Sequence, residues 1–294
     1  MWIDYIDMIK ETIQISEQGY YIKNNETKHL KTSASEREQS ILLSPETLCQ
    51  IAKSLKETTP SHRPGTCEVN MSNKDSFQAA QDMAEHYHIE NTRNILVLNF
   101  ANPVCPGGGV LKGAKAQEED LCRKSTLYLS LRTEEARAMY EYNQALNDYR
   151  SSNYMLLSPN VEIFRDSDGG FLNETMVAGV LTAAAPIAPF GINDEVRKEL
   201  LEILRTRIQN ILHAAAFYNY QYLVLGAWGC GAFGNDAAQV AQLFYEELQN
   251  FQRPSGSIDS RFRGIVFAVL NPSKGGYNYK YFEKYFDGFS LEPV

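Results

Sequence analysis

Two adjacent glutamates behind a glycine triplet are the residues of this chain best suited to chemistry. The run comprises Gly107, Gly108 and Gly109 and then, after a short stretch, Gln117, Glu118 and Glu119. Glycine lets a backbone approach a ligand closely and adopt positive φ, and carboxyl groups beside such a loop can exchange protons with a ligand. A simpler explanation is a flexible connector whose acids complement the positive end of the next helix. That explanation suffices for the glycines alone, but it accounts less well for paired acids at a helix start behind a buried strand.

A second glycine-rich loop runs from Leu225 to Asp236. Its glycines are Gly226, Gly229, Gly231 and Gly234. Backbone N–H groups of such a loop can cradle a diphosphate at the start of the next helix, which Asn235 or Asp236 can cap. The spacing differs from the G-x-G-x-x-G fingerprint, and a tight structural turn is the commoner explanation of the glycines alone. Phe233 is more informative, because an aromatic residue amid glycines either packs in the core or contacts a sugar face.

The remaining candidates for chemistry are weaker. His86 and His88 lack a third ligand at a recognisable spacing, which is more typical of a surface turn than of a metal site. Cys105 has no assigned base, which is more typical of a small packed residue than of a nucleophile. The sequence contains neither a G-x-S-x-G elbow nor a Walker A motif. We therefore expect no metal and no cofactor.

Buried strands and amphipathic helices alternate around both loops. The first loop follows the apolar run Ile95–Phe100, which is typical of a buried strand. The second lies between a strand at Tyr222–Leu225 and a helix at Asp236–Phe251. Further helices are predicted at 2–18, 76–87, 117–131, 134–149 and 194–217, and further strands at 67–70, 161–164, 176–181 and 264–270. The alternation predicts an α/β layered domain, in which ligands bind at the carboxyl ends of strands.

Residues 1–65 have a lower apolar content than the rest of the chain. They contain the amphipathic helix at 2–18, a helix start at Ser44-Pro45 and then a series of Pro and Gly residues. We interpret residues 1–65 as a helical N-terminal extension packed on a domain that comprises residues 66–294.

The composition is that of an ordinary folded protein. Of 294 residues, 44% are hydrophobic and 22% are charged. The net charge of −8 argues against a DNA- or RNA-binding surface, although backbone N–H groups can still bind a small anionic ligand. The five cysteines form no CxxC pair, which favours a reducing compartment. Neither a signal peptide nor the roughly 20 apolar residues of a membrane helix is evident, so we expect a cytoplasmic protein.

Together these segments resemble the microbial-type poly(ADP-ribose) glycohydrolase family, whose catalytic part is a macro domain. The family motif is three glycines followed, after a variable stretch, by Gln-Glu-Glu, and here it reads GGGVLKGAKAQEE. Other similar segments are EQGYY, ILVLNFA, LCRKSTLY, SPNVEIFRD, TAAAP and LGAWGCGAFGND. The resemblance implies a macro domain-like mixed sheet between helices. It also implies a hydrolase that cleaves ribose–ribose bonds to release ADP-ribose.

The resemblance also implies roles for the residues of both loops. Glu119 resembles the general acid/base of the family, and Glu118 resembles a ligand of ribose hydroxyls. Adjacent helical residues point about 100° apart, which agrees with different roles for the two acids. The expected ligand is ADP-ribose or poly(ADP-ribose), free or on modified proteins. The predicted substrate-binding residues are Asn102, Gly107, Gly108, Gly109, Val110, Gln117, Gly229, Cys230, Gly231, Ala232 and Phe233.

Three positions depart from the family pattern. Cys105 stands where an asparagine precedes Pro-Gly-Gly-Gly, and Asn102 is the candidate replacement. Ile187 replaces an asparagine after TAAAP, and Ala232 replaces a larger aliphatic residue. Two alternatives stay open: removal of a single ADP-ribose from a protein or small-molecule conjugate, and non-catalytic ADP-ribose binding. The intact glutamate pair argues against a pure binder, which needs no acid at a scissile bond.

Overall fold

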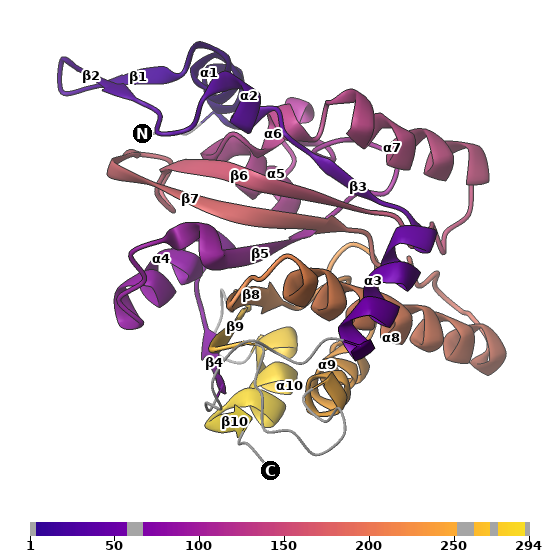
Figure 1. Ribbon diagram of the computed structural model, residues 1–294. Helices are drawn as coiled ribbons and strands as arrows, with labels where there is room; N and C mark the ends of the chain where they lie inside the picture. Colours follow the sequence, from indigo (N-terminus) through magenta and orange to yellow (C-terminus); the bar gives the residue numbers. More distant parts are fainter. Residues whose placement is uncertain (1–3, 58–66, 252–261, 271–275, 292–294) are drawn as a thin grey trace.

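The computed structural model describes residues 4–57, 67–251, 262–270 and 276–291, and a mixed sheet forms their centre (Figure 1). Within these residues the sheet has eight strands in the order β10-β4-β9-β8-β5-β7-β6-β3. The strands are β3 (Ile41–Leu43), β4 (Cys67–Ser72), β5 (Ile95–Phe100), β6 (Met155–Arg165), β7 (Phe171–Ala183), β8 (Tyr222–Gly226), β9 (Gly264–Ala268) and β10 (Phe289–Leu291). Neighbours from β4 to β7 pair in parallel, whereas β10, β6 and β3 pair antiparallel. The carboxyl ends of β5 and β8 therefore lie side by side.

Helices cover both faces of this sheet, as predicted (Figure 1). One face carries α3 (Pro45–Glu57), α8 (Asp194–Phe217), α9 (Ala237–Phe251) and α10 (Tyr277–Phe286). The other carries α1 (Tyr5–Gln18), α4 (Ser76–His86), α5 (Gln117–Lys124), α6 (Leu127–Ser130) and α7 (Glu134–Leu146). Strand β5 is apolar on both sides because Leu96 and Leu98 pack in the first core and Ile95 and Val97 in the second.

The N-terminal residues contribute strands as well as helices. Strands β1 (Tyr20–Lys23) and β2 (Glu26–His29) form a hairpin that precedes α2 (Ala34–Arg37), and β3 pairs with β6 at the edge of the main sheet. The predicted N-terminal extension thus shares its sheet with residues 66–294. The predicted boundary at residue 65 lies outside the described residues.

A buried carboxylate anchors this N-terminal segment. Glu162 of β6 is fully buried, and its Oε1 accepts hydrogen bonds from the backbone N–H of Lys31 (2.8 Å) and the hydroxyl of Thr175 (2.6 Å). Its Oε2 accepts from the backbone N–H (2.8 Å) and hydroxyl (2.7 Å) of Thr32. These four hydrogen bonds replace the hydration that the Glu162 carboxylate loses on burial.

Several predicted elements have different bounds in the structure. The helix predicted at 117–131 is two helices, α5 and α6, because Ser125 forms a β-bridge with Ile163 between them. Strands β6 and β7 are much longer than the predicted 161–164 and 176–181. The edge strands β3 and β10 were not predicted. In the described part of the chain, no helix is long and apolar enough to cross a membrane.

Candidate active site

Both glycine-rich loops leave the carboxyl ends of neighbouring strands, β5 and β8, as the sequence predicts. In the first loop Gly107 and Gly108 have φ of 68° and 58°. A Cβ on Gly108 would lie 2.4 Å from Oε1 of Glu119 and 3.1 Å from Oε2 of Glu118. The backbone therefore lies directly against both carboxyl groups, which only glycine allows. The short 3-10 helix η2 (Val110–Lys112) follows the glycine triplet and precedes α5.

Glu118, in the first turn of α5, is a buried acid held by the end of β5. Its Oε1 accepts from Nδ2 of Asn99 (3.2 Å), and its Oε2 accepts from the backbone N–H of Asn102 (2.7 Å). The pKa of Glu118 is raised to about 8, because burial, together with the nearby Glu119 charge, outweighs the hydrogen bonds, which lower it. Burial therefore favours the protonated form of this side chain.

Glu119 is also buried, but its surroundings differ. Its Oε1 accepts from the backbone N–H of Gly109 (2.8 Å). Its Oε2 is buried and has no hydrogen-bond partner among the described residues. One oxygen is thus fixed by the glycine loop while the other is left for a ligand or water, since a buried carboxylate oxygen without a partner is costly.

The side chains of two predicted substrate-binding residues, Val110 and Gln117, have partners within the protein. Val110 is fully buried, and its side chain packs in the core next to α1. Gln117 accepts from the backbone N–H of Phe100 (2.8 Å) and donates to the carbonyl of Leu98 (2.8 Å) and the hydroxyl of Ser76 (3.1 Å). Although Gln117 lines the cleft described below, its amide is used to join α5 to β5.

The side chains of Trp228 and Asn235 fix the second loop by hydrogen bonds to backbone carbonyls. Trp228 is fully buried and donates from Nε1 to the carbonyl of Ala183 (2.9 Å). Asn235 donates from Nδ2 to the carbonyls of Pro186 (2.8 Å) and Gly229 (3.0 Å), so it does not cap α9. Asp236 caps that helix instead, by accepting from two of its backbone N–H groups.

Three consecutive backbone N–H groups of this loop are available to a ligand. Those of Gly231, Ala232 and Phe233 donate to no acceptor in the described part of the chain. Gly231 and Ala232 are exposed, and Phe233 is half-buried against the core. Such a row of amides is suited to binding an anion.

A cleft of about 570 Å³ extends along the carboxyl ends of the parallel strands. Its walls include Phe100, Lys115, Gln117 and the second loop from Trp228 to Phe233. Within that part of the loop, Cys230 does not line the cleft. This volume lies within the usual range for small-ligand pockets of about 300–1,000 Å³. Gln117 and Asp120, on either side of the two glutamates in α5, line this cleft, whereas Glu118, Glu119 and the glycine triplet are not part of its walls.

Polar residues of α5 form a charged cluster in the cleft wall. Lys124 pairs with Asp120 (2.7 Å) and with Asp75 (3.1 Å), which also accepts from the Ser167 hydroxyl (2.5 Å). The Lys124 ammonium and the Ser167 hydroxyl outweigh burial and lower the pKa of Asp75, whereas burial raises the pKa of Asp120 despite the same ammonium. Asp75 is thus the firmly ionised member of the cluster.

His86 and His88 lie outside this arrangement, and the cysteines form no disulfide. His86 is exposed at the end of α4, with Nε2 3.7 Å from a carboxylate oxygen of Glu68. All five cysteines are free. No cluster of three or more potential metal ligands exists among the described residues.

Comparison with known proteins places this site in a family. The family model of the microbial-type PARG catalytic domain matches residues 9–166, more than half of the chain. The poly(ADP-ribose) glycohydrolase of Thermomonospora curvata is 32% identical, with a TM-score of 0.84, over 96% of this chain and 99% of that one. The chain belongs to the microbial-type poly(ADP-ribose) glycohydrolase family. It is accordingly an enzyme of the glycohydrolase class, and the predicted resemblance is confirmed.

Two other solved structures of the family contain bound ligands. The Thermomonospora curvata enzyme with the inhibitor ADP-HPD is 31% identical, over 95% of this chain and 98% of that one, with a TM-score of 0.82. The Deinococcus radiodurans enzyme in complex with ADP-ribose is 32% identical, over 89% and 99% of the two chains, with a TM-score of 0.77. No curated protein sequence matches the chain.

The start of the glycine loop is where this chain departs from its family pattern. Cys105 is exposed, and it follows a turn closed by Asn102, whose Oδ1 accepts from the backbone N–H of Val104 (3.0 Å) and Cys105 (2.9 Å). The side-chain oxygen of Asn102 is thus used within the loop. Its Nδ2 is the part of the side chain that can serve as the replacement ligand.

Sequence reasoning missed Asn99, a fully buried polar residue of β5. Besides Glu118, its Nδ2 contacts the hydroxyl of Thr182 on β7 (3.1 Å). A signal for it was present, because Asn99 is the polar residue in the apolar run ILVLNF.

Proposed function

We propose that this enzyme hydrolyses the O-glycosidic ribose–ribose bonds of poly(ADP-ribose) and releases ADP-ribose, with Glu119 as the general acid/base. The observation that carries the proposal is the state of the Glu119 carboxyl group. One oxygen is held by the N–H of Gly109, and the other is buried without a partner among the described residues. The complexes of the two related enzymes with ADP-ribose and with ADP-HPD support an ADP-ribosyl ligand.

The geometry supports a binding mode that uses both loops. The free amides of Gly231, Ala232 and Phe233 would bind the diphosphate, and the ring of Phe233 would lie against the distal ribose. Glu118, which Asn99 and Asn102 hold at the end of β5, would bind ribose hydroxyls. The glycine triplet would bring its backbone close to the sugar, because it carries no side chain next to the two acids.

In the reaction, Glu119 transfers its proton to the ribose oxygen that leaves. The bond between this oxygen and the anomeric carbon breaks with its electron pair on the oxygen, and an oxocarbenium-like sugar develops. A water molecule adds to the anomeric carbon, and its proton passes to the Glu119 carboxylate, which restores the acid. The bound diphosphate is negatively charged and stabilises the positive sugar.

The test is hydrolysis of purified poly(ADP-ribose) by wild type and by Glu119→Gln, with free ADP-ribose measured by chromatography. Because general acid–base catalysis contributes about 10²–10⁴-fold, we expect kcat to fall by about 10³-fold. The matched control is Glu135→Gln, on the exposed first turn of α7, which should keep its turnover. A folded Glu119→Gln protein with near wild-type turnover would show that Glu119 is not the acid.

The alternative substrate is a protein that carries a single ADP-ribose. It is favoured by the exposed Cys105, which stands where the family pattern has an asparagine. Rates of ADP-ribose release from polymer and from a mono-modified protein, measured at equal ADP-ribose concentration, separate the two. Faster release from the mono-modified protein would replace the polymer as the proposed substrate without changing the role of Glu119.

A further inference from the structure

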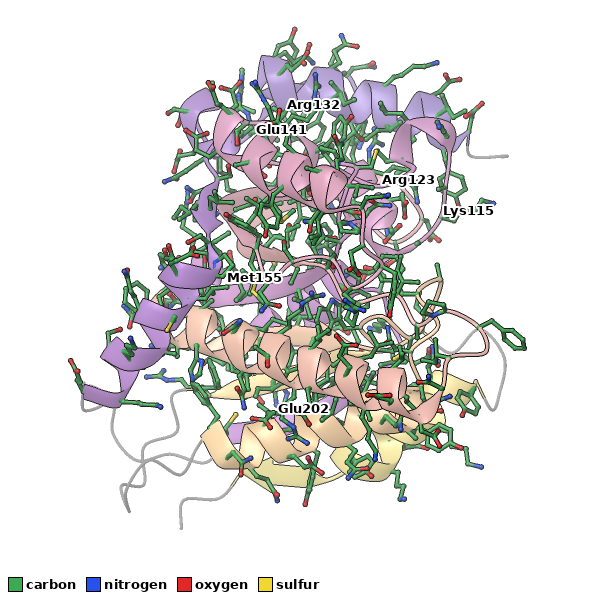
Figure 2. All side chains as sticks on the ribbon, turned by 90° about the vertical axis from the view of Figure 1, so that its right-hand side faces the viewer. Lys115, Arg123, Arg132, Glu141, Met155 and Glu202 are labelled. Carbon is green, nitrogen blue, oxygen red and sulfur yellow. The ribbon has the colours of Figure 1, made fainter. Side chains whose placement is uncertain are left out.

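The N-terminal helix α1 packs directly on η2, which follows the glycine triplet, and on α5. The ring of Tyr5 lies under two cations, with its centroid 4.5 Å from the guanidinium carbon of Arg123 and 5.0 Å from Nζ of Lys115. Figure 2 shows Lys115 and Arg123 close together at one edge of the molecule. At the C-terminal side of α1, the hydroxyl of Thr12 donates to the carbonyl of Arg123 (2.7 Å).

The contact fixes the residue that precedes Lys115. Arg123 is only 2% exposed, and its Nη1 donates to the carbonyl of Ala114 (2.5 Å). Its Nε has no hydrogen-bond partner among the described residues, so the Tyr5 ring is a compensating contact for a cation that has lost its water. Tyr5 thus contacts Lys115 directly and also contacts Arg123, which binds the carbonyl of the preceding Ala114.

Lys115 is the cleft-lining lysine that keeps its charge available. Of the three lysines in the walls, Lys74 pairs with Asp82 (2.6 Å), and Lys124 pairs with two aspartates. Lys115 is exposed and takes part in no ion pair within the described residues. In a chain of net charge −8, an unpaired ammonium in the wall of a cleft is a local attraction for an anion.

We propose that Lys115 binds a phosphate group of the ligand, and that Tyr5 is the positioning residue that holds Lys115 at the cleft. This inference rests on the proposed function, which supplies the phosphate. Tyr5 precedes residues 9–166, the part of the chain that the family model matches. The phosphate belongs either to the ADP-ribose unit in the cleft or to the adjoining unit of a polymer, and the experiment distinguishes them.

The first experiment compares wild type, Lys115→Gln and the control Lys112→Gln. Lys112 is an exposed lysine of η2, three residues earlier, that does not line the cleft. For Lys115→Gln we expect KM for polymer to rise about three- to tenfold with unchanged kcat, and KM to depend less on salt. Calorimetry with ADP-ribose assigns the phosphate. An equal loss of affinity indicates the same unit, and unchanged affinity indicates the adjoining unit. If Lys115→Gln matches Lys112→Gln in both assays, the role of Lys115 is refuted.

The second experiment tests Tyr5 with a conservative and a disruptive variant. Tyr5→Phe keeps the ring and should keep wild-type KM, while Tyr5→Leu should raise KM as Lys115→Gln does, again at unchanged kcat. Since Tyr5→Leu and Lys115→Gln act on the same contact with phosphate, the double variant should have the same KM as Lys115→Gln alone. The positioning role would be refuted if the effects of the two substitutions on KM multiplied in the double variant, or if folded Tyr5→Leu had the wild-type KM. If Tyr5→Leu does not fold, Tyr5→Met takes its place. If wild type leaves the polymer intact, the proposed function fails. Calorimetry of the Lys115 variants with both ADP-ribose and polymer then still decides the binding role, because wild-type affinity for both ligands would refute it.

Discussion

Replacing Gly108 by alanine should separate activity from stability in this enzyme. The new Cβ would lie 2.4 Å from Oε1 of Glu119, whereas ordinary contact begins near 3.4 Å. The nearest atom belongs to the far end of a flexible side chain, so the Glu119 carboxyl group, and not the backbone, should move by about 1 Å. That movement breaks its alignment with the N–H of Gly109.

The two consequences differ in size. Alanine at the φ of 58° found for Gly108 costs about 1–2 kcal/mol, which lowers Tm by only a few degrees in a chain of this length. Misplacing a catalytic group by about 1 Å costs about 10²-fold in rate. Turnover should therefore fall by about 10²-fold in a protein that is still folded at the assay temperature.

The assay is ADP-ribose release at saturating polymer, with Tm measured on the same samples. Gly288→Ala is the matched control, because Gly288 has a φ of 66° and a Cβ added there would meet no described atom within 4 Å. It should show a similar loss of Tm and wild-type turnover. A Gly108→Ala protein within threefold of wild type would refute the argument, as would an equal loss of turnover in Gly288→Ala.

Two further predictions concern stability. Because the pKa of Glu118 is raised from 4.5 to about 8, the folded state binds more protons than the unfolded state between these values, and the free energy of unfolding should fall as pH rises through them. Glu118→Gln should remove this decline, up to about 1.4 kcal/mol per pH unit, in urea denaturation from pH 5 to 8, and a parallel decline in both proteins would contradict it. Glu162→Gln should turn an amide toward two donors and lower the free energy of unfolding by about 3 kcal/mol, measured with urea, with unchanged turnover per folded molecule.

The sequence predicts the centre of the fold better than its edges. Strand β5 and helix α8 have the predicted bounds, because long apolar patterns determine them locally. The edge strands β3 and β10 have three residues each, and their partners are distant in sequence, so no local pattern marks them. The helix predicted at 117–131 is interrupted by a bridge to β6, a tertiary contact that overrides local preference.

The same distinction applies to the site. The two glycine loops and the glutamate pair were predicted at the correct strand ends, since each motif is contiguous in sequence. The contact of Tyr5 with Arg123 joins residues far apart in the chain, and neither has an unusual local pattern. Val110 and Gln117 were predicted as ligand contacts because they belong to the motif. The sequence did not show that the Val110 side chain packs in the core and that the Gln117 amide bonds to β5.

The partners of the two glutamates suggest how one helical turn can support two roles. Glu118 is held by Asn99 and Asn102, at the end of a strand in the middle of the sheet, so its position follows the rigid core. Glu119 is held by Gly109, in a loop whose far end rests on Arg123 and hence on α1. A shift of that loop should therefore move the proposed acid and leave the proposed ribose ligand in place. On this reasoning, changes in α1 alter turnover only if they reach Gly109, whereas changes in β5 alter the binding of the sugar first.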